Sequence, residues 1–361
     1  MCTVLAYFDA NGLIYTGRTL EFVGPSPNQM AYFPVGTRME SFTPAGKQGV
    51  TFNTKYAIFG VLVEGISKAK QGTLHEAMNE YGLTISTNSL GGNSSPDISG
   101  VPDSQIISVT DLGVWALGNF KTVAEVKQAI KNNDVQFWLP IIPLLGTEPA
   151  PIHFALWDRT GAGIVIEWAT GKTEVYDNEV CVLTNNPPFP WHLENMGNYT
   201  FLTNIDKNTA QFNKLQVKAF DGGANMANLP STATSPGRFV RAAYYSQFVY
   251  KGKTPQEAIL TLGHVMNNFD RPTGISVDVS SDLPAGERSM LGAAETSASE
   301  VTSWTVLRDL NQNHFYIRTI DSLNFSVFDM NQMSGIKTPT FVSMEALNAN
   351  KTLDGNHLFV S

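Results

Sequence analysis

The order of strand-like and helix-like segments predicts an α+β fold built on antiparallel sheets. Runs of β-rich sequence come first, a pair of helical segments follows in the second half, and strand-like runs return towards the C-terminus. Blocks of strands separated by helices favour antiparallel sheets, whereas a doubly wound parallel sheet needs strands and helices in alternation. The chain does not show that alternation.

A hairpin is expected at the start of the chain. Residues 2–8 form a β-rich run, Asn11-Gly12 gives a strong hairpin-turn signal, and residues 13–20 return. Further strands are expected at 29–34, 56–63 and 83–87. A β-meander is expected over 153–157, 163–168, 173–176 and 180–184.

Apolar spacing predicts the helices. They are expected at 122–132, 238–250 and 255–268. Val123, Val126 and Ile130 recur at helical spacing in the first, and Thr254 with Pro255 gives the third a cap and a proline at its first position. Three strands at 303–307, 314–320 and 324–328 complete the prediction.

Size and composition limit the possible functions. The chain has 361 residues, 42% of them hydrophobic, and no linker rich in Pro or Ser divides it, so we expect a single domain over residues 1–361. A formal net charge of −8, without a run of Lys or Arg, argues against nucleic acid as a partner. No run of 18 apolar residues is present, so no membrane span is expected.

Cysteine and histidine placement argues against disulfides and metals. The two cysteines, Cys2 and Cys181, are too few for a disulfide framework or a Cys-rich metal motif. Cys181 lies in an apolar run and is expected to be a small core residue of a buried strand. Six scattered histidines show no ligand spacing, so no metal site is predicted.

Cys2 is the first candidate for catalysis. It follows Met1 directly, so removal of that methionine would leave a thiol and a free α-amine on one residue. The reference pKa of an α-amine is about 7.7–8.0 and that of a thiol about 8.5, so such an amine can accept the thiol proton near neutral pH. N-terminal nucleophiles use this arrangement. A cysteine at position two is more often not catalytic, so the case depends on the residues that follow.

Arg18 and Glu21 stand on the returning strand of the expected hairpin. A two-residue turn at Asn11-Gly12 places Cys2 opposite Glu21, whose carboxylate could then orient the α-amine. Side chains alternate along a strand, so this register turns Arg18 to the other face, and a bulge near Gly17 would be needed to bring it to the thiol. A cation there would favour the thiolate. The alternative is a surface ion pair between Arg18 and Glu21.

Four ordered motifs resemble the choloylglycine hydrolase family of N-terminal-nucleophile hydrolases, which includes bile salt hydrolases and penicillin V acylases. The motifs are Cys2-Thr3 with Gly17-Arg18-Thr19-Leu20-Glu21-Phe22, Met78-Asn79-Glu80-Tyr81-Gly82-Leu83, Leu183-Thr184-Asn185-Asn186-Pro187 with Trp191-His192, and Ser235-Pro236-Gly237-Arg238-Phe239-Val240-Arg241. Each alone is weak, but their order and spacing together are specific, and the resemblance runs along most of the chain.

The resemblance implies a fold and a set of roles. The fold is a four-layer αββα sandwich of two antiparallel sheets between helical layers, and the reaction is hydrolysis of linear C–N amides without a cofactor. Cys2 would be nucleophile and base, Arg18 would lie beside the thiol, Asn185 would donate to the oxyanion, and Arg238 would complete the polar shell. An amide donor of this kind lowers a barrier by roughly 3–4 kcal/mol. The alternatives are a turn asparagine for Asn185 and a helix-start arginine for Arg238.

Two positions depart from the family pattern. Glu21 stands where the family usually has Asp, which adds a methylene between backbone and charge. Asn88 lies one residue before the place of the second oxyanion donor in bile salt hydrolases, which Ser89 occupies. The second donor is therefore expected to be either the Asn88 side chain or its backbone N–H.

The apolar stretch 137–145 contains Pro140 and Pro143, which exclude a helix. It is either a buried loop or, as we expect from the large apolar acyl groups of family substrates, a wall of the acyl pocket.

These features predict an amidohydrolase whose nucleophile, Cys2, is exposed by removal of Met1. Penicillin V or N-acyl homoserine lactones are the favoured substrates because of the departures at Glu21 and Asn88, and conjugated bile salts are the alternative. A catalytically inactive binding protein of the same fold is the alternative from another class, and retention of Met1 would favour it. A Ser-His-Asp hydrolase lacks its Gly-x-Ser-x-Gly elbow.

The expected partner is a small amide with an apolar acyl group, and the resemblance implies a homotetramer, although no interface can be read from the sequence. We expect a cytoplasmic location if Met1 is the natural start, and a periplasmic or secreted one if a signal peptide precedes Cys2 in the natural gene.

Overall fold

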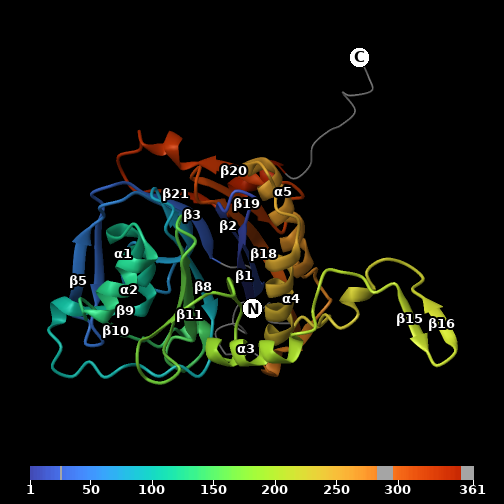
Figure 1. Cartoon of the computed structure of the whole chain (residues 1–361). Coiled ribbons are helices and arrows are strands. Elements are labelled where there is room, and N and C mark those ends of the chain that lie inside the picture. Colours follow the sequence, from blue (N-terminus) through green and yellow to red (C-terminus); the bar gives the residue numbers. More distant parts are fainter. Residues whose placement is uncertain (25–26, 283–295, 351–361) are drawn as a thin grey trace, which may run out of the picture.

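Two antiparallel sheets lie face to face in the computed structural model, which describes residues 1–24, 27–282 and 296–350 (Figure 1). Cys2 and Leu20 from one sheet share a buried apolar cluster with Phe59 and Met78 from the other. The nucleophile candidate therefore starts a strand at the junction between the two sheets.

The seven-stranded sheet combines the first two strands of the chain with strands from its second half. Its order is β14-β1-β2-β18-β19-β20, with β17 also paired to β18. The strands are β1 (Cys2–Phe8), β2 (Ile14–Val23), β14 (Val182–Leu183), β17 (Val277–Val279), β18 (Ser297–Asp309), β19 (His314–Thr319) and β20 (Ser326–Asp329). The N-terminal strand is thus central, with a neighbour on each side.

The eight-stranded sheet has the order β13-β12-β11-β8-β7-β6-β3-β21. Its strands are β3 (Asn28–Phe33), β6 (Ile58–Val63), β7 (Thr73–Asn79), β8 (Thr84–Ser89), β11 (Ile152–Trp157), β12 (Gly163–Glu167), β13 (Glu174–Asp177) and β21 (Thr340–Ser343). Three further two-stranded pairs are β4 (Arg38–Phe42) with β5 (Gln48–Asn53), β9 (Ile106–Ser108) with β10 (Gln136–Trp138), and β15 (Thr209–Phe212) with β16 (Leu215–Lys218).

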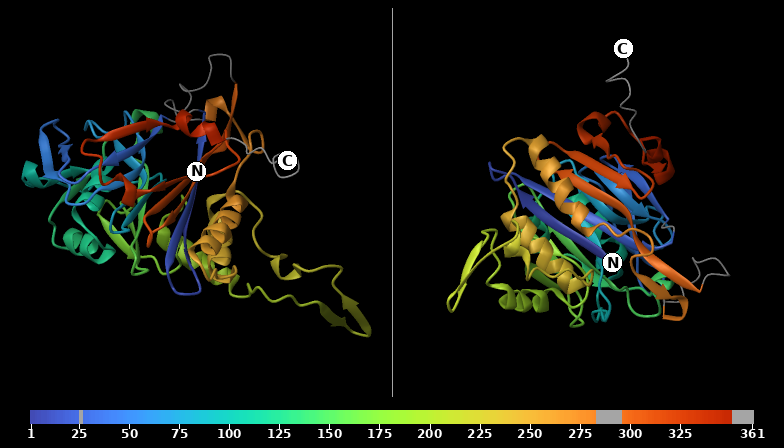
Figure 2. Two further views of the ribbon diagram at one scale, coloured as in Figure 1. Left: turned by 90° about the horizontal axis from the view of Figure 1, so that it is seen from above. Right: turned by 90° about the vertical axis from the view of Figure 1, so that its right-hand side faces the viewer.

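Helices cover the outer faces of both sheets (Figure 2). The long helices α4 (Ser235–Phe248) and α5 (Pro255–Met266) pack on the seven-stranded sheet, and α1 (Leu112–Asn119) and α2 (Val123–Lys131) pack on the eight-stranded sheet. A short helix, α3 (Phe189–Met196), lies near the start of β1. The resulting order of layers confirms the predicted αββα sandwich.

Helix capping follows the sequence where the signals were strong. Thr122 and Glu125 form a reciprocal capping box at α2, and the Thr254 side chain accepts from Glu257 N at the start of α5. Helix α1 was not predicted because all of its residues except Asn119 are buried, so its sequence shows no polar face. No helix in the described ranges has the length and apolar character needed to cross a bilayer.

The predicted meander is wrong in its last strand. β14 pairs with β1 in the seven-stranded sheet instead of joining β13 in the other sheet. The chain is redirected at Cys181, which has a left-handed backbone with φ of 60° and lies in the turn before β14. Cys181 is therefore a partly exposed turn residue and not the buried strand residue expected, although burial still raises the pKa of its thiol to about 11.

The predicted register of the first hairpin is also wrong, by one residue. Cys2 pairs with Leu20, and Val4 pairs with Arg18. The turn is longer than expected because Asp9 bonds the backbone of Leu13 across it and its carboxylate accepts from the N–H groups of Asn11 and Leu13. A three-residue loop ending in a left-handed glycine, here Gly12 with φ of 78°, is the next commonest hairpin turn.

The corrected register resolves the placement of Arg18. Cys2, Leu20 and Arg18 now share one face of the sheet because paired and alternate residues point the same way. No bulge near Gly17 is needed. Gly17 pairs regularly with Leu5, and its missing side chain makes room for Met266 of α5, which would lie 2.7 Å from an added Cβ.

Candidate active site

Cys2 lines a cavity of about 330 Å³ between the two sheets. Cys2 itself is 3% exposed, so the cavity gives the thiol its access to small molecules. Cavities of a few hundred Å³ with apolar walls and a few polar groups are typical binding sites for small ligands.

Arg18 lies beside the thiol. Its Nη2 donates to Cys2 Sγ at 3.2 Å and also bonds the carbonyl of Thr87. Its Nη1 donates to the carbonyl of His75 at 2.5 Å and forms an ion pair with Glu76 at 2.9 Å. Because the guanidinium is fixed from three sides, its positive charge is held at the sulfur rather than at the surface.

Asn185 and Arg238 hold the backbone of Cys2. The Cys2 N–H donates to Asn185 Oδ1 at 2.8 Å, and Arg238 Nη2 donates to the same oxygen at 2.8 Å. Arg238 Nη1 also bonds the carbonyl of Cys2 and donates to Thr3 Oγ1 at 2.8 Å. Because Asn185 Oδ1 accepts from two donors, the amide orientation is fixed and Nδ2 remains as a donor.

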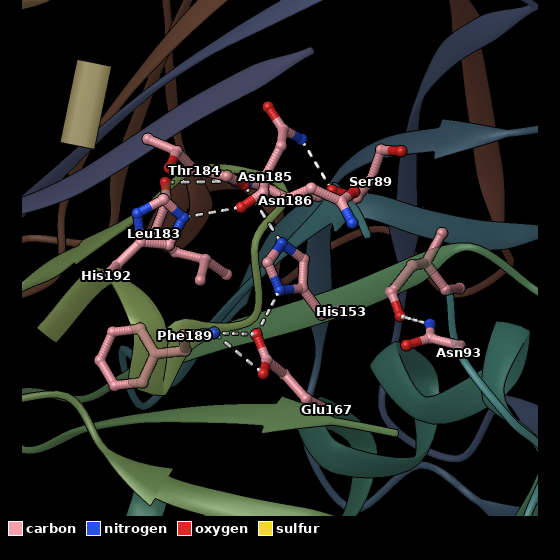
Figure 3. Close-up of polar contacts among 12 residues, drawn as sticks. Ser89, Asn93, His153, Glu167, Leu183, Thr184, Asn185, Asn186, Phe189 and His192 are labelled. Carbon is pink, nitrogen blue, oxygen red and sulfur yellow. Dashed lines mark hydrogen bonds and ion pairs between the residues drawn. The ribbon is translucent and has the colours of Figure 1, made fainter. Parts of the chain in front are cut away.

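A layer of hydrogen bonds fixes the segment that carries Asn185 (Figure 3). Asn185 Nδ2 uses one hydrogen on the carbonyl of Ser89 at 2.8 Å, and His192 Nε2 bonds the Asn185 carbonyl at 2.9 Å. His153 joins the carboxylate of Glu167 at 2.8 Å to the carbonyl of Thr184 at 3.1 Å. The second hydrogen of Asn185 Nδ2 has no such commitment among the described residues.

His192 illustrates why the Trp-His motif accompanies Asn185. Its ring stacks on Phe239 with centroids 4.4 Å apart, and burial lowers the pKa of the imidazole. A neutral ring with Nε2 protonated can donate to the Asn185 carbonyl, so His192 positions the backbone of Asn185 without adding charge.

Asn88 lines the cavity, but its side-chain amide is committed elsewhere. Asn88 Nδ2 donates to the carbonyls of Leu183 at 3.3 Å and Thr184 at 2.8 Å, while Oδ1 is buried and has no partner within residues 1–24, 27–282 and 296–350. The expected use of this amide as a free oxyanion donor does not fit these contacts. The one-residue offset from Ser89 turns the Asn88 side chain towards β14.

The backbone of Glu21 pairs with Met1. The expected cross-strand neighbour was Cys2. The Glu21 N–H donates to the Met1 carbonyl at 2.8 Å, and the Met1 amine donates to the Glu21 carbonyl at 2.7 Å and to Glu300 at 3.1 Å. The Glu21 carboxylate is fully buried and accepts from Thr302 through Oε1 at 3.2 Å, while Oε2 has no hydrogen bond with any described residue. Burial raises the pKa of Glu21.

The cavity walls are largely apolar. Part of the Pro-containing stretch contributes Ile142, Leu144 and Leu145, whereas Phe137 lies in the core under α1. The expectation of an apolar wall is thus confirmed for the second half of that stretch. Pro143 to Leu145 form a short 3₁₀ turn.

Sequence reasoning missed His75, which a β-bulge turns into the cavity. Val61 pairs with Glu76 and Leu62 with Leu74, so His75 is the extra residue in β7. Leu74 and Ala77 both lie in the core under α1, which strict alternation forbids without such a bulge. Burial, with Arg18 nearby, holds the pKa of His75 well below its ordinary range.

Glu76 and Arg308 were also missed, because nothing in their local sequence marks them. Each is fully buried, and Arg308 Nη2 lies 2.6 Å from Glu76 Oε1. In the ranges that the structure describes, no group of three or more His, Cys, Asp or Glu side chains has a metal-binding arrangement. The site therefore provides a thiol beside a guanidinium, with an amide donor at the same cavity.

Comparisons with known proteins match this chain over nearly its whole length. The model of the linear amide C-N hydrolases, choloylglycine hydrolase family, matches residues 2–336. The bile salt hydrolase/transferase of Clostridium perfringens is 28% identical over 364 residues, which cover 99% of this chain and 100% of that protein.

Solved structures give the same relationship. A variant of the conjugated bile acid hydrolase from Clostridium perfringens superposes with a TM-score of 0.76 at 25% identity, covering 99% of this chain and 100% of the other. Penicillin V acylase from Agrobacterium tumefaciens shares the fold, with a TM-score of 0.70 at 21% identity over 92% of this chain and 87% of the other. With nearly its whole length matched by the family model, this chain belongs to the choloylglycine hydrolase family of linear amide C–N hydrolases.

Proposed function

We propose that this chain hydrolyses conjugated bile salts, the amides of a bulky apolar acyl group with a small amino acid. The observation that carries the proposal is the Cys2 sulfur at an apolar-walled cavity, with Arg18 at 3.2 Å. The named relatives with the most complete coverage are bile salt hydrolases, which favours this substrate over penicillin V and N-acyl homoserine lactones. The departures at Glu21 and Asn88 had favoured the latter two.

Removal of Met1 is the first requirement of the mechanism. It would give Cys2 a free α-amine next to Asn185 Oδ1, which already accepts from the Cys2 nitrogen at 2.8 Å. It would also release the Glu21 backbone and Glu300 from their contacts with Met1. The unpartnered Oε2 of Glu21 is then the carboxylate oxygen that we assign to the new ammonium group.

Catalysis then proceeds through a thioester. The α-amine of Cys2 takes the thiol proton, and the sulfur, held by Arg18, attacks the amide carbon of the substrate. Asn185 Nδ2 donates its free hydrogen to the oxyanion, while Arg238 keeps Asn185 in place. The ammonium of Cys2 protonates the departing amine, and water cleaves the thioester to release the acid.

Asn88 has a positioning role in this mechanism. Its amide ties β8 to the carbonyls of Leu183 and Thr184, directly before Asn185. Loss of that tie would move the oxyanion donor rather than remove it.

Release of the amine product tests the proposal. Protein shown by intact mass to lack Met1 is incubated with a glycine-conjugated bile salt, penicillin V and a long-chain N-acyl homoserine lactone, with Cys2→Ala in parallel. We expect release from the bile salt, fastest of the three, and none from Cys2→Ala. Preference for either other amide would replace the substrate assignment, and release that persists in Cys2→Ala would overturn Cys2 as nucleophile. Cys181→Ala, which removes the other thiol, is the matched control and should keep its activity.

We further infer that the chain self-associates, as the expected homotetramer requires. The hairpin β15–β16 projects away from both sheets (Figure 1), and Phe212, Leu215 and Phe220 are 64%, 62% and 109% exposed. Apolar side chains on a projecting arm favour burial against another surface. Light scattering tests this: we expect an oligomer that Phe212→Asp with Leu215→Asp weakens, and a monomeric parent protein would contradict it.

A further inference from the structure

Three buried charged side chains meet behind the sulfur of Cys2. Arg18 and Arg308 come from the adjacent strands β2 and β18, where Arg18 pairs with Val306 and Arg308 pairs with Thr16. Paired and alternate residues share a face, so both arginines leave the same side of the seven-stranded sheet. Glu76 reaches them from β7 of the opposite sheet.

One carboxylate serves both arginines. Glu76 Oε2 lies 2.9 Å from Arg18 Nη1, and Glu76 Oε1 lies 2.6 Å from Arg308 Nη2. The side chains of all three are 0% exposed. Arg308 makes its remaining contacts with neutral groups, namely Thr16 Oγ1, Ser86 Oγ and the carbonyls of Ala77 and Ile85. Two guanidinium groups and one carboxylate leave an excess of positive charge.

The excess positive charge lies next to the Cys2 sulfur. Arg18 uses Nη1 on Glu76 and turns Nη2 to Cys2 Sγ at 3.2 Å. Burial and the neighbouring Arg18 lower the pKa of Arg308 to about 10, so it keeps its charge at neutral pH. His75, whose pKa is held low, is neutral there and does not alter the balance. Uncompensated charge inside a protein is costly, so the cluster favours an anion at its open side.

We propose that Glu76 and Arg308 tune the nucleophile: the thiolate of Cys2 is the anion that balances the cluster, and Arg308 is a positioning residue acting through Glu76 and Arg18. The proposal rests on the proposed function in taking Cys2 as the nucleophile. It adds that the reactivity of Cys2 follows the net charge of three side chains, two of which do not touch the sulfur.

Other charged groups near Cys2 lie on its amine side. They are the α-amine itself, Glu21 on β2, Glu300 on β18, Arg238 on α4, and Arg271. They are unchanged in the variants below, so they affect each variant equally.

The test is the rate at which iodoacetamide alkylates Cys2 as a function of pH, in Met1-free protein that carries Cys181→Ala. No amide substrate is involved, so the result does not depend on the substrate assignment. Arg308→Met removes one positive charge and should slow alkylation at pH 7 about tenfold, with the pH profile moved upwards by about one unit. Glu76→Gln removes the negative charge and should move the profile downwards.

The double variant Glu76→Gln with Arg308→Met decides between charge and structure. It keeps the parent net charge, so its profile should return close to that of the parent, and Arg308→Lys should also stay close. Thermal unfolding verifies that each variant is folded. If Glu76→Gln does not fold, the two charge-conserving variants still test the proposal.

Identical profiles in the parent and Arg308→Met would overturn the proposal, even with reduced amide turnover, because Arg308 would then merely tie the sheets together. A double variant that follows Arg308→Met would overturn it as well. If the alkylation profiles are as expected but no amide in the panel is hydrolysed, the result supports the charge cluster and contradicts the proposed substrates.

Discussion

Charge is buried on both faces of the eight-stranded sheet, and the two faces hold it differently. On the inner face, Glu76 is flanked by Arg18 at 2.9 Å and Arg308 at 2.6 Å. On the outer face, at the start of α1, Asp111 accepts from the hydroxyls of Ser41 and Ser67, both at 2.7 Å. Burial raises the pKa of Asp111 to about 6.

The difference shows how each face accommodates a buried charge. No cation pairs with Asp111 in the part of the chain that the structure describes, so protonation relieves the cost of its burial. Around Cys2 the cations exceed the carboxylates that contact them, so the charge is available to an anionic sulfur or a developing oxyanion. The predictions that follow alter one face at a time, beginning with the largest effect.

Asn185→Ala should have the largest effect on the inner face. It removes the donor at the oxyanion and one anchor of the Cys2 nitrogen, so we expect kcat to fall about 10²–10³-fold. Steady-state kinetics measure this, with Asn186→Ala as control. Asn186 lines the same cavity but its side chain bonds the backbone of Gly91 instead of Cys2, and the variant should stay close to the parent. An equal loss in both variants would contradict the role of Asn185.

Arg238→Lys should reduce kcat by about tenfold with little change in KM. A single ammonium cannot reproduce the bonds that Arg238 makes with Cys2 O, Thr3 and Asn185. Arg241→Lys on the same helix is the matched control, since Arg241 contacts the carbonyls of Pro230 and Thr232 away from Cys2. A change in KM alone would show that Arg238 binds substrate instead of orienting Asn185.

On the outer face, Asp111→Asn should stabilise the protein at pH 7.5 by about 1–2 kcal/mol. The folded pKa of about 6 exceeds the ordinary value of 3.8, so the folded state binds more protons between these values. The parent therefore loses stability as pH rises from about 4 to about 6, and the variant does not. Urea unfolding across this range measures the difference, and parallel curves would contradict it.

The corresponding substitution of a carboxylate on the inner face should change the stability of the fold in the opposite direction. Glu76→Gln leaves Arg18 and Arg308 facing one another without a carboxylate, so it should destabilise the fold at pH 7.5, where Asp111→Asn stabilises it. Stabilisation by both variants would remove the contrast between the two faces.

Leu144→Ala should give the smallest effect. It shortens an apolar wall without touching any charge, so we expect KM for a bulky acyl amide to rise about three- to tenfold. Leu323, which is 77% exposed, is the control for the same substitution. A fall in kcat instead of a rise in KM would place Leu144 among the residues that position the reacting bond.

Local signals were sufficient for much of the fold. The caps of α2 and α5 and most strands follow from residues within a few positions of each other. The hairpin turn was recognised, but its length was not, because Asn-Gly suits both two- and three-residue loops. The Asp9 carboxylate selected the longer one and thereby the face of Arg18.

For the candidate site, motif resemblance selected Cys2, Arg18, Asn185 and Arg238, and the fold brings these side chains within hydrogen-bonding distance of Cys2 or of each other. Asn88 and Glu21 also reach the cavity, with partners that the sequence did not indicate.

The sequence by itself determined an α+β fold of antiparallel sheets and the cysteine behind Met1, because turn residues, caps and hydrophobic periodicity act over short distances. The αββα layering was implied by the resemblance to the family. Only the tertiary structure decided which charges surround the sulfur. Glu76 and Arg308 lie 232 residues apart in the chain and meet because two sheets pack face to face. A buried charge without a partner is costly, and where a distant strand supplies that partner, as here, no local pattern records the pairing.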